Sequence, residues 1–515
     1  MGDPMLQEKM LDGLRRLLGD KGVVTDPAGL GGITENTLGV PRVLAGCVYP
    51  RSVEDVAGVV ALAREFKVPI YPISRGRNIG YGERIPVLDG QLLVDLSRMN
   101  AIREFNPVTG HVMIEPGVTQ IQLHGFLKSK NAAYWMDATG AGLDASIVGN
   151  TLEGGFGHTP RGNRRANISD VEIVLGNGVI LRTGQFPGLG PDLAGLFVQS
   201  NFGVVTAMRV ALMPVPESFE SFMIGIKSES DLPALIDTIR SLRQQDSITS
   251  LVHVANAMRS YITTNKCPEG ADNHLLSSEE AARLMSTAVV RVGLWTAIGG
   301  IYGSRDEVRA RKKVLRRAFA RLGHIAFFSD WKIGLLVRLL RLWPVSATKM
   351  GAKLLRSLLS YREMHGLMRG VPSDEPLKNI LWRAGSEDDM GLVWFSPAAV
   401  ADGGIIKKIV DTSGAIYARH GFEMPVTVTL VAPDRVVCAF SISFDLSKPG
   451  QRERAHTLYK ELRANLAELG LTTYRLAVMG MEKLRLPEPG RQETLLKLKE
   501  VLDPYGIISP GRYGM

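Results

Sequence analysis

Two glycine-rich segments constrain what this chain can fold into more than any other feature. The first, residues 72–82, follows a β-branched and aromatic run at 68–73 that is typical of a strand. Its three closely spaced glycines bring backbone N–H groups together, so the loop can approach a pyrophosphate without side-chain clashes. The second runs from residues 146–150 into 153–158 and has the same chemistry. Two such loops fit one long diphosphate cofactor better than a single nucleotide phosphate.

Composition bounds the class of protein. The 515 residues carry a net charge of +9, from 61 Lys and Arg against 52 Asp and Glu, which favours acidic partners or substrates. The three cysteines, Cys47, Cys267 and Cys438, stand far apart. We therefore expect neither a disulfide framework nor a metal site. The N-terminus has no apolar signal core and no stretch is apolar enough to span a bilayer, so we expect a cytoplasmic protein.

The hydrophobic pattern predicts helices and strands without a regular βαβ repeat, which indicates an α+β fold. A break at 214–216 separates two regions of different texture. Before it we expect helices at 53–66 and 118–130, a hairpin at 171–181 and a strand at 204–213. After it we expect helices at 228–245 and 277–287, a long basic helical region at 305–372, strands at 392–395, 426–431 and 436–444, and a helix at 450–469.

The basic amphipathic segment 333–343 has two interpretations. It is either a packing helix with arginines on its solvent face, or a helix that lies on an anionic membrane or a partner surface. Aromatic and basic residues do not alternate here as a stacking platform requires, so we expect no nucleic-acid binding.

Several longer motifs resemble one known family. They are YPRSVEDV at 49–56, the glycine loop at 76–82, IEPGVT at 114–119, VGNT at 148–151, GHTP at 157–160, QSNFGVVT at 199–206, Tyr474-Arg475, and the tail at 503–514. Together they resemble the vanillyl-alcohol oxidase and p-cresol methylhydroxylase family of FAD-linked oxidases. The likeness spans most of the chain and is weakest over 218–375.

The resemblance implies an architecture of two subdomains that bind FAD and an α/β cap over the substrate. The FAD-binding domain would comprise residues 1–217, mainly 42–217, and the cap residues 218–470. The segment 471–515 would return to the FAD-binding domain. FAD would be held by Ser74, Gly76, Arg77, Asn78, Ile79, Gly80, Tyr81, Ser146, Gly149, Asn150, Gly154, Gly157, His158, Val205, Arg475 and Arg512.

The resemblance also implies a substrate. Tyr81, Tyr474 and Arg475 match the residues with which the phenol-oxidising branch binds its substrate. Two hydroxyls and a guanidinium that converge on a phenol oxygen favour the phenolate. The expected activity is removal of a hydride from the benzylic carbon of a para-substituted phenol through a quinone methide. The electron acceptor would be O2 or a redox protein, and the family predicts a homo-oligomer.

Three departures from the family shape the details. Leu392 stands where covalent members have a histidine, which predicts dissociable FAD. The loop that holds Asp137 and Asp144 is one residue longer than in the form compared, so either carboxylate would reach the site only if the loop is rebuilt. His158 replaces the frequent tyrosine; it is either a base or flavin neighbour, or a packed histidine.

A fourth departure is an arginine-rich turn. Arg161 and Arg164 either bind a substrate carboxylate or form a solvated basic turn. With no water-activating aspartate, an anion site suggests an alternative activity: oxidative decarboxylation of a phenolic acid to a vinylphenol. Two further alternatives are a superfamily member that acts on a hydroxy acid or another alcohol, and a basic binding protein that has kept the flavin fold without turnover.

Overall fold

A small, mostly parallel sheet holds the first glycine-rich loop. The computed structural model describes residues 7–184, 188–265, 267, 275–286, 292–342, 348–384 and 386–515. The sheet has the order β1 (Val23–Val24), β2 (Leu44–Val48), β4 (Gln91–Asp95) and β3 (Ile70–Ile73), and β2, β4 and β3 are parallel. Helix α3 (Val53–Phe66), which the sequence predicted, connects β2 to β3, and Ser52 caps its first turn. Helices α1 (Glu8–Leu18) and α2 (Pro27–Thr34) precede β2.

An antiparallel sheet of five strands supports the second loop. Its order is β5 (Ile102–Asn106), β6 (His111–Ile114), β10 (Gly203–Ala211), β8 (Ile168–Leu175) and β9 (Ile180–Arg182). The predicted hairpin is β8 and β9. Helix α4 (Gln120–Ser129) begins where expected, because Thr119 Oγ1 accepts a hydrogen bond from the backbone of Gln122. Strands β7 (Tyr134–Trp135) and β11 (Met213–Pro214) pair beside it.

The remaining strands form one sheet of nine. Its order is β15 (Ile325–Phe328), β12 (Ser218–Ile226), β14 (Trp295–Gly303), β13 (Val252–Asn256), β18 (Val426–Ala432), β19 (Arg435–Asp445), β17 (Pro397–Val400) and β20 (Thr472–Thr473), and β16 (Met390–Phe395) pairs with β19. The mixture of helices with separate sheets confirms the α+β class. All but β20 lie within the predicted cap range 218–470; the domain boundaries themselves stay a prediction.

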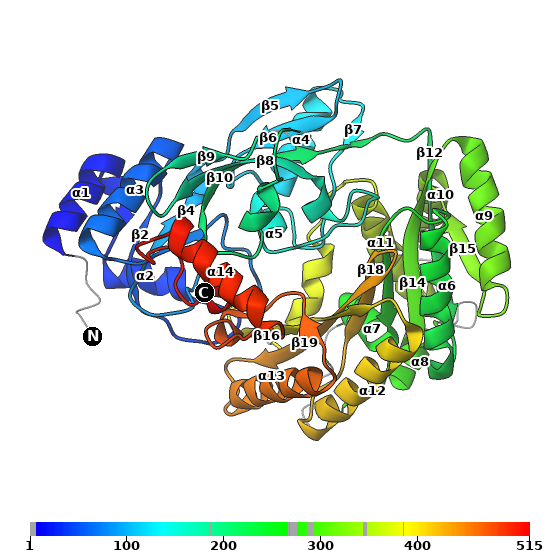
Figure 1. The fold of residues 1–515 in the computed structure, drawn as a ribbon. Helices are drawn as coiled ribbons and strands as arrows, with labels where there is room; N and C mark the ends of the chain where they lie inside the picture. The colour runs from blue at the N-terminus through cyan, green and yellow to red at the C-terminus, as the bar shows by residue number, and fades with distance from the viewer. Residues whose placement is uncertain are drawn as a thin grey trace.

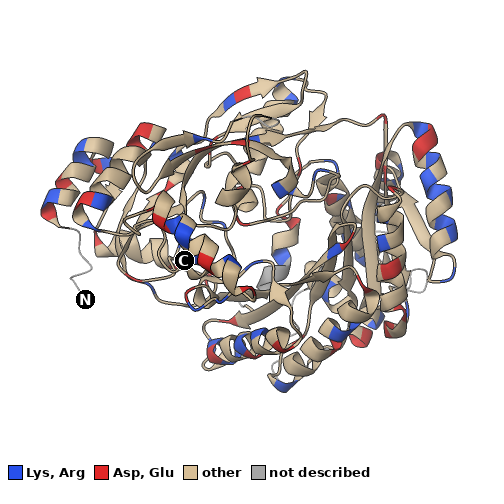
Figure 2. Cartoon of the chain, viewed as in Figure 1, with Lys and Arg blue, Asp and Glu red and all other residues tan. Residues whose placement is uncertain are grey.

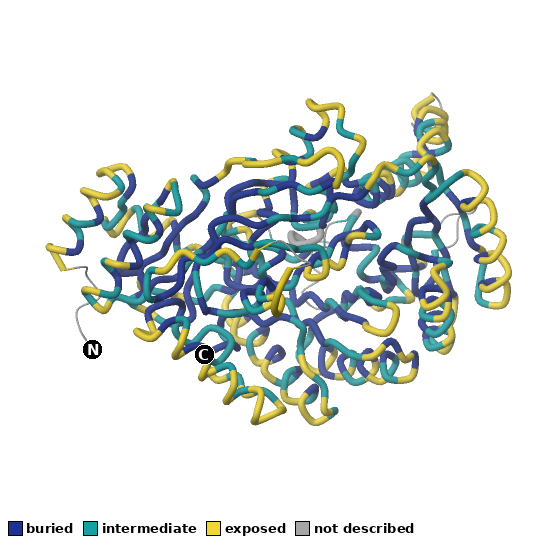
Figure 3. Tube along the Cα trace, turned by 45° about the horizontal axis from the view of Figure 1, so that its top comes forward, coloured by how far each residue is buried: buried dark blue, intermediate teal, exposed yellow. Residues whose placement is uncertain are grey.

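The two faces of the nine-stranded sheet have different roles, because successive side chains of a strand point to opposite faces. One face packs in the main core against α6 (Leu232–Gln244), α9 (Arg305–Phe319), α12 (Gly403–Arg419) and α13 (Gln451–Glu468) (Figure 1). Its side chains include Phe222, Ile224, Val252, Val254, Ala297, Val426, Val428 and Phe440. The alternate residues face a cavity. Figure 3 shows that the buried residues lie along the inner segments of the chain and the exposed ones mainly on its outer turns.

The region 305–372 is not helical throughout, which corrects the sequence prediction. Helix α9, whose exposed face is basic (Figure 2), is followed by strand β15, and then by α10 (Asp330–Arg341) and α11 (Lys349–Leu367). The segment 325–328, IAFF, forms a strand because it can pair with β12 at the sheet edge. Residues 287, 343–347 and the first six residues, about which the sequence also made predictions, lie outside the described residues.

Helix α10 has both an inner and an outer apolar face. Ile333 and Val337 are buried against α11, whereas Trp331, Leu335 and Leu339 stay exposed. The inner side chains pack as the first interpretation expects, and the second interpretation stays a prediction for the outer ones. No helix among the described residues is long and apolar enough to cross a membrane.

The C-terminal segment joins the sheets together. After β20 it continues through α14 (Pro489–Leu502), and Ile508 forms an isolated bridge with Ile70 of β3. Helices α5 (Ile147–Leu152), α7 (Ala257–Thr264) and α8 (Ser278–Met285) complete the elements near the cavity.

Candidate functional site

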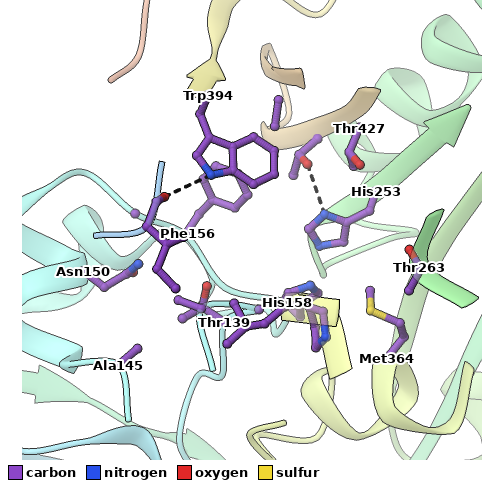
Figure 4. Close-up of a pocket in the computed structure, with 18 of the residues that line it drawn as sticks. Thr139, Ala145, Asn150, Phe156, His158, His253, Thr263, Met364, Trp394 and Thr427 are labelled. Atoms are coloured by element: carbon purple, nitrogen blue, oxygen red, sulfur yellow. Dashed lines mark hydrogen bonds between the residues drawn. The ribbon is translucent and has the colours of Figure 1, made fainter. Parts of the chain in front are cut away.

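A cavity of about 710 Å³ lies between the glycine-rich loops and the nine-stranded sheet (Figure 4). The loops supply one wall, and the sheet and helices α7 and α11 supply the other. The sheet residues that line it include Met223, His253, Ala255, Thr296, Ile298, Thr427, Thr429 and Ala439. They alternate along the strands with the core residues given above, so the strand period itself creates this wall.

The first loop is held in shape by its own glycines and by a buried carboxyl group. Gly76 has a φ of +65°, and a Cβ there would lie 2.4 Å from the side chain of Arg84. The backbone N–H of Gly80 donates to Thr37 Oγ1 at 2.9 Å and to Glu83 Oε1 at 3.2 Å. Burial raises the pKa of Glu83 to about 7.

The second loop contacts the first directly. Ser146 Oγ accepts a hydrogen bond from the backbone of Gly149 at 2.8 Å and so caps α5. A Cβ on Gly149 would lie 2.9 Å from Ser74 Oγ. The two segments that the sequence singled out therefore meet along one side of the cavity, and only a residue without a side chain fits between them.

The residues around these loops fit a dinucleotide such as FAD. Of the predicted FAD residues, those that line the cavity are Ser74, Gly76, Arg77, Asn78, Ile79, Tyr81, Ser146, Gly149, Asn150, His158, Arg475 and Arg512. The Nε atom of Arg512 is buried without a hydrogen-bond partner among the described residues, so this cation keeps a donor that its neighbours do not use. Glu153 holds these two arginines in place through ion pairs.

Four of the predicted FAD residues do not line the cavity. A Cβ on Gly80 would clash with Trp394 and Leu392, and a Cβ on Gly157 would clash with Asp137. Gly154 has a φ of +69° and turns the chain after α5. Val205 is a buried residue of β10. These four residues therefore affect the shape of the loops and do not contact the cavity.

Tyr81, Tyr474 and Arg475 come together at one end of the cavity. The backbone N–H of Tyr474 donates to the carbonyl of Ser396 at 2.9 Å, and the Tyr81 hydroxyl lies 2.9 Å from Ser396 Oγ. The guanidinium of Arg475 lies 4.3 Å from the centre of the Tyr81 ring and hydrogen-bonds Asn78. Burial, followed by the neighbouring Tyr474, raises the pKa of Tyr81 well above its ordinary value. Tyr81 is therefore a neutral hydrogen-bond donor.

His158 faces a second histidine, His253, which the sequence analysis missed. The centres of the two rings are 4.3 Å apart, and both residues line the cavity. His158 Nδ1 hydrogen-bonds the carbonyl of Ala138 and His253 Nδ1 hydrogen-bonds Thr429 Oγ1, both at 3.1 Å. Burial lowers the pKa of each. Both imidazoles are thus neutral at pH 7.

The arginine-rich turn does not reach the cavity, which contradicts the substrate-carboxylate role predicted for Arg161 and Arg164. Arg164 is buried and pairs with Asp137 at 2.9 Å. Arg161 bonds Asn167 at 3.2 Å. Neither Asp137 nor Asp144 lines the cavity, and Asp144 instead pairs with Arg77 at 3.3 Å. The longer loop therefore supplies no carboxylate to the cavity, because both of its aspartates form ion pairs with arginines.

Two cavity residues, Trp394 and Arg259, had no usable signal in the sequence. Trp394 lies in an apolar strand, where an indole is typical of a core residue, yet its Nε1 donates to the Ile79 carbonyl at 3.1 Å. Arg259 lies in α7, within the segment that least resembles the family. Only the strand alternation of β13 could have indicated His253.

Comparisons with known proteins agree with this geometry. Residues 44–184 match the FAD binding domain family. The chain is 30% identical to 1'-carboxy-chondrochloren decarboxylase of Chondromyces crocatus over 98% of this chain and 97% of that protein. It is 28% identical to the flavoprotein subunit of 4-cresol dehydrogenase (hydroxylating) of Pseudomonas putida, over 98% and 95%.

Solved structures show the same fold. Crystalline p-cresol methylhydroxylase with bound substrate superimposes with a TM-score of 0.88 at 26% identity, over 99% of this chain and 98% of that one. The 4-ethylphenol oxidase of Gulosibacter chungangensis, in complex with isoeugenol, gives a TM-score of 0.87 at 25% identity, over 100% and 98%. The similarity covers both the loop side and the sheet side of the cavity.

Proposed function

The chain belongs to the family of FAD-dependent oxidoreductases that includes p-cresol methylhydroxylase, and we propose that it oxidises a para-substituted phenol at the benzylic carbon. The observation that carries the proposal is the convergence of Tyr81, Tyr474 and Arg475 at one end of the cavity. Similarity to phenol-oxidising enzymes along the whole chain supports the same substrate class.

The three residues would bind the phenol oxygen as an anion. The two tyrosine hydroxyls donate hydrogen bonds to it, and Arg475 supplies a positive charge in a buried setting, where charge interactions are strong. The phenol would release its proton to solvent as it binds, while the Tyr81 hydroxyl keeps its own proton and has Ser396 Oγ as its neighbour at 2.9 Å. A phenolate pushes electron density toward the para carbon and so weakens the benzylic C–H bond.

Bound FAD would supply the two-electron acceptor for the hydride that leaves the benzylic carbon. We propose that the cofactor is dissociable, because Leu392, fully buried behind Gly80, has no atom that could form a link to it. Acid precipitation of the purified protein should then release the flavin into the supernatant, whereas a covalent flavin would stay with the pellet.

A second activity, oxidative decarboxylation, competes with hydroxylation for the quinone methide. Hydroxylation needs a base for water, and neither nearby aspartate lines the cavity, because Asp144 pairs with Arg77 and Asp137 pairs with Arg164. If the side chain bears a carboxylate, the C–C bond to it can break instead. Its electron pair forms the alkene and restores the phenolate, and CO2 leaves. Similarity to a decarboxylase favours this candidate.

Anaerobic titration of the purified holoprotein tests the function. We expect 4-ethylphenol to bleach the oxidised flavin, and its O-methyl ether, which cannot ionise, to leave the flavin unchanged. Bleaching by a 2-hydroxy acid but by no phenol would contradict the proposal. With 3-(4-hydroxyphenyl)propionate, CO2 and 4-vinylphenol would indicate decarboxylation, and a benzylic alcohol would indicate hydroxylation.

The acceptor and the assembly are proposals of the same kind. Reoxidation of the bleached flavin by air would identify O2 as the electron acceptor. A flavin that stays reduced in air would indicate a redox protein as the acceptor. Light scattering of the holoprotein would test the homo-oligomer.

A further inference from the structure

One arginine on the sheet side of the cavity has no counterion among the residues that the structure describes. Arg259 lies on α7, whose first turn is capped by Asn256. Its guanidinium lies 5.5 Å from the centre of the Trp394 ring, and Trp394 in turn donates to the carbonyl of Ile79 in the first glycine-rich loop. Arg259 thus lines the cavity beside the loop that leads to Tyr81.

The hydrogen-bonding capacity of Arg259 is not used by the protein. Its Nη1 is buried and has no hydrogen-bond partner among the described residues. Burial lowers the pKa of Arg259 to about 10, and no neighbouring charge contributes to the shift. By contrast, the buried Arg164 has Asp137 as a partner, and the buried Arg243 donates to the carbonyl of Leu430.

The acidic residues that line the cavity form contacts with residues other than Arg259. The only carboxyl groups among the described lining residues are Glu83 and Glu153. Glu153 is held by Arg475, Arg512 and Tyr513. Glu83 accepts hydrogen bonds from Thr37 and Gly80 through Oε1, and it contributes no charge interaction to the pKa of Arg259. The other cation on this wall, Lys353, donates to the carbonyl of Ser286 at 2.8 Å. Within the described part of the chain, Arg259 therefore has a free donor and an uncompensated charge.

A buried charge without a partner destabilises the folded protein, because it has lost its hydration and gained nothing in return. A ligand that carries an anion would remove this penalty on binding. Arginine suits a carboxylate in particular, since its planar fork can donate two parallel hydrogen bonds. The remaining wall is largely apolar, with Met223, Ile298, Phe328 and Leu358, which suits the carbon skeleton of such a ligand.

We propose that Arg259 binds a carboxylate on the side chain of the phenolic substrate, so that the enzyme prefers phenolic acids to neutral alkylphenols. The inference rests on the proposed phenol oxidation and names its substrate class. It moves the carboxylate site from the arginine-rich turn, which lies outside the cavity, to the cap. The same residue would serve a substrate that loses its carboxylate or one that keeps it.

The test compares an acid with its neutral isostere. The dissociation constants of 3-(4-hydroxyphenyl)propionate and of its amide are measured from the concentration dependence of anaerobic flavin reduction. In the wild-type holoprotein we expect the acid to bind more tightly. Arg259→Met should weaken binding of the acid by about 10- to 100-fold, the usual range for a charge-assisted hydrogen bond, and should leave binding of the amide nearly unchanged.

Two variants separate the role of Arg259 from folding. Arg259→Lys keeps the charge and should retain part of the preference. Arg243→Met removes a buried guanidinium of the cap that does not line the cavity, and it should leave the acid-to-amide ratio unchanged. Equal binding of acid and amide in the wild type, or an unchanged ratio in Arg259→Met, would overturn the inference.

Control substrates distinguish this failure from failure of the proposed function. If 4-ethylphenol bleaches the flavin and the acid shows no advantage over the amide, phenol oxidation stands and the carboxylate site falls. If no phenol bleaches the flavin, the proposed function fails and the inference fails with it.

Discussion

At the scale of single residues, the site depends on polar groups that are buried and positioned before the substrate arrives. Tyr81 and Arg475 are each less than a tenth exposed, and their neighbours Ser396, Asn78 and Glu153 fix their orientation. Preorganised donors of this kind stabilise developing charge without reorganisation during the reaction.

Removing the hydroxyl of Tyr81 should therefore slow the reaction. We expect Tyr81→Phe to lower the rate of anaerobic flavin reduction by 4-ethylphenol about 100-fold, the usual effect of deleting one such donor. Tyr417→Phe is the matched control, because that hydroxyl bonds the carbonyl of Ser441 in the cap core and does not line the cavity. Stopped-flow absorbance measures both. Equal rates in wild type and Tyr81→Phe would remove Tyr81 from the account.

At the scale of elements, the close approach of the two glycine-rich loops is the feature to perturb. A Cβ on Gly149 would lie 2.9 Å from Ser74 Oγ and 3.1 Å from Ser74 Cβ. Gly149→Ala should push the loops apart and weaken FAD binding about tenfold, an estimate based on overpacking costs of roughly 1–3 kcal/mol. Gly195→Ala, where nothing lies within 4 Å, should bind FAD normally. Fluorescence titration of the apoprotein gives both affinities.

The carboxyl group that anchors the first loop predicts a pH dependence of stability. The pKa of Glu83 is raised to about 7 in the folded protein, so folding favours its protonated form. Its stabilising contribution is complete below the ordinary carboxyl pKa and is lost as the pH rises to about 7. From the size of the shift, this loss is about 3 kcal/mol.

Calorimetry of wild type and Glu83→Gln across this range tests the assignment. The glutamine cannot ionise, so the melting temperature of the variant should fall less than that of the wild type between about pH 4.5 and 7. Parallel curves for the two proteins would mean that Glu83 does not carry the effect.

At the scale of the whole molecule, the site exists because distant parts of the chain close on one another. Tyr81 lies in the loop that follows β3 of the first sheet, whereas Tyr474 and Arg475 follow β20 of the nine-stranded sheet. Hydrogen bonds of Trp394 to Gly80 and of Val478 to Tyr81 connect them. The tail adds Arg512 and Tyr513, both bound to Glu153.

The sequence predicted the parts of this arrangement that short motifs determine. Both loops, the Tyr81, Tyr474 and Arg475 cluster, and most elements could be read from local patterns. Arg259 could not, because an arginine in an amphipathic helix usually faces solvent, and only the tertiary fold turns this one toward a cavity. Arg164 was misassigned for the converse reason: its partner, Asp137, lies 27 residues away.

Strand β15 was missed because a short apolar segment between two basic helices has no periodicity of its own. It becomes a strand only through pairing with β12, which lies about 100 residues earlier in the chain. Pairing with a strand that is distant in sequence thus determines the secondary structure of a segment whose local propensity does not determine it.

The ionisation state of a bound phenol is the most direct test of the central claim. The phenolate of 4-nitrophenol absorbs at a longer wavelength than the neutral phenol, so a difference spectrum of the holoprotein reports which form is bound. If Tyr81, Tyr474 and Arg475 stabilise the anion, the bound ligand should be phenolate at a pH where free 4-nitrophenol is mostly neutral, and Tyr81→Phe should reduce that fraction. A bound ligand with the spectrum of the neutral phenol would contradict the account.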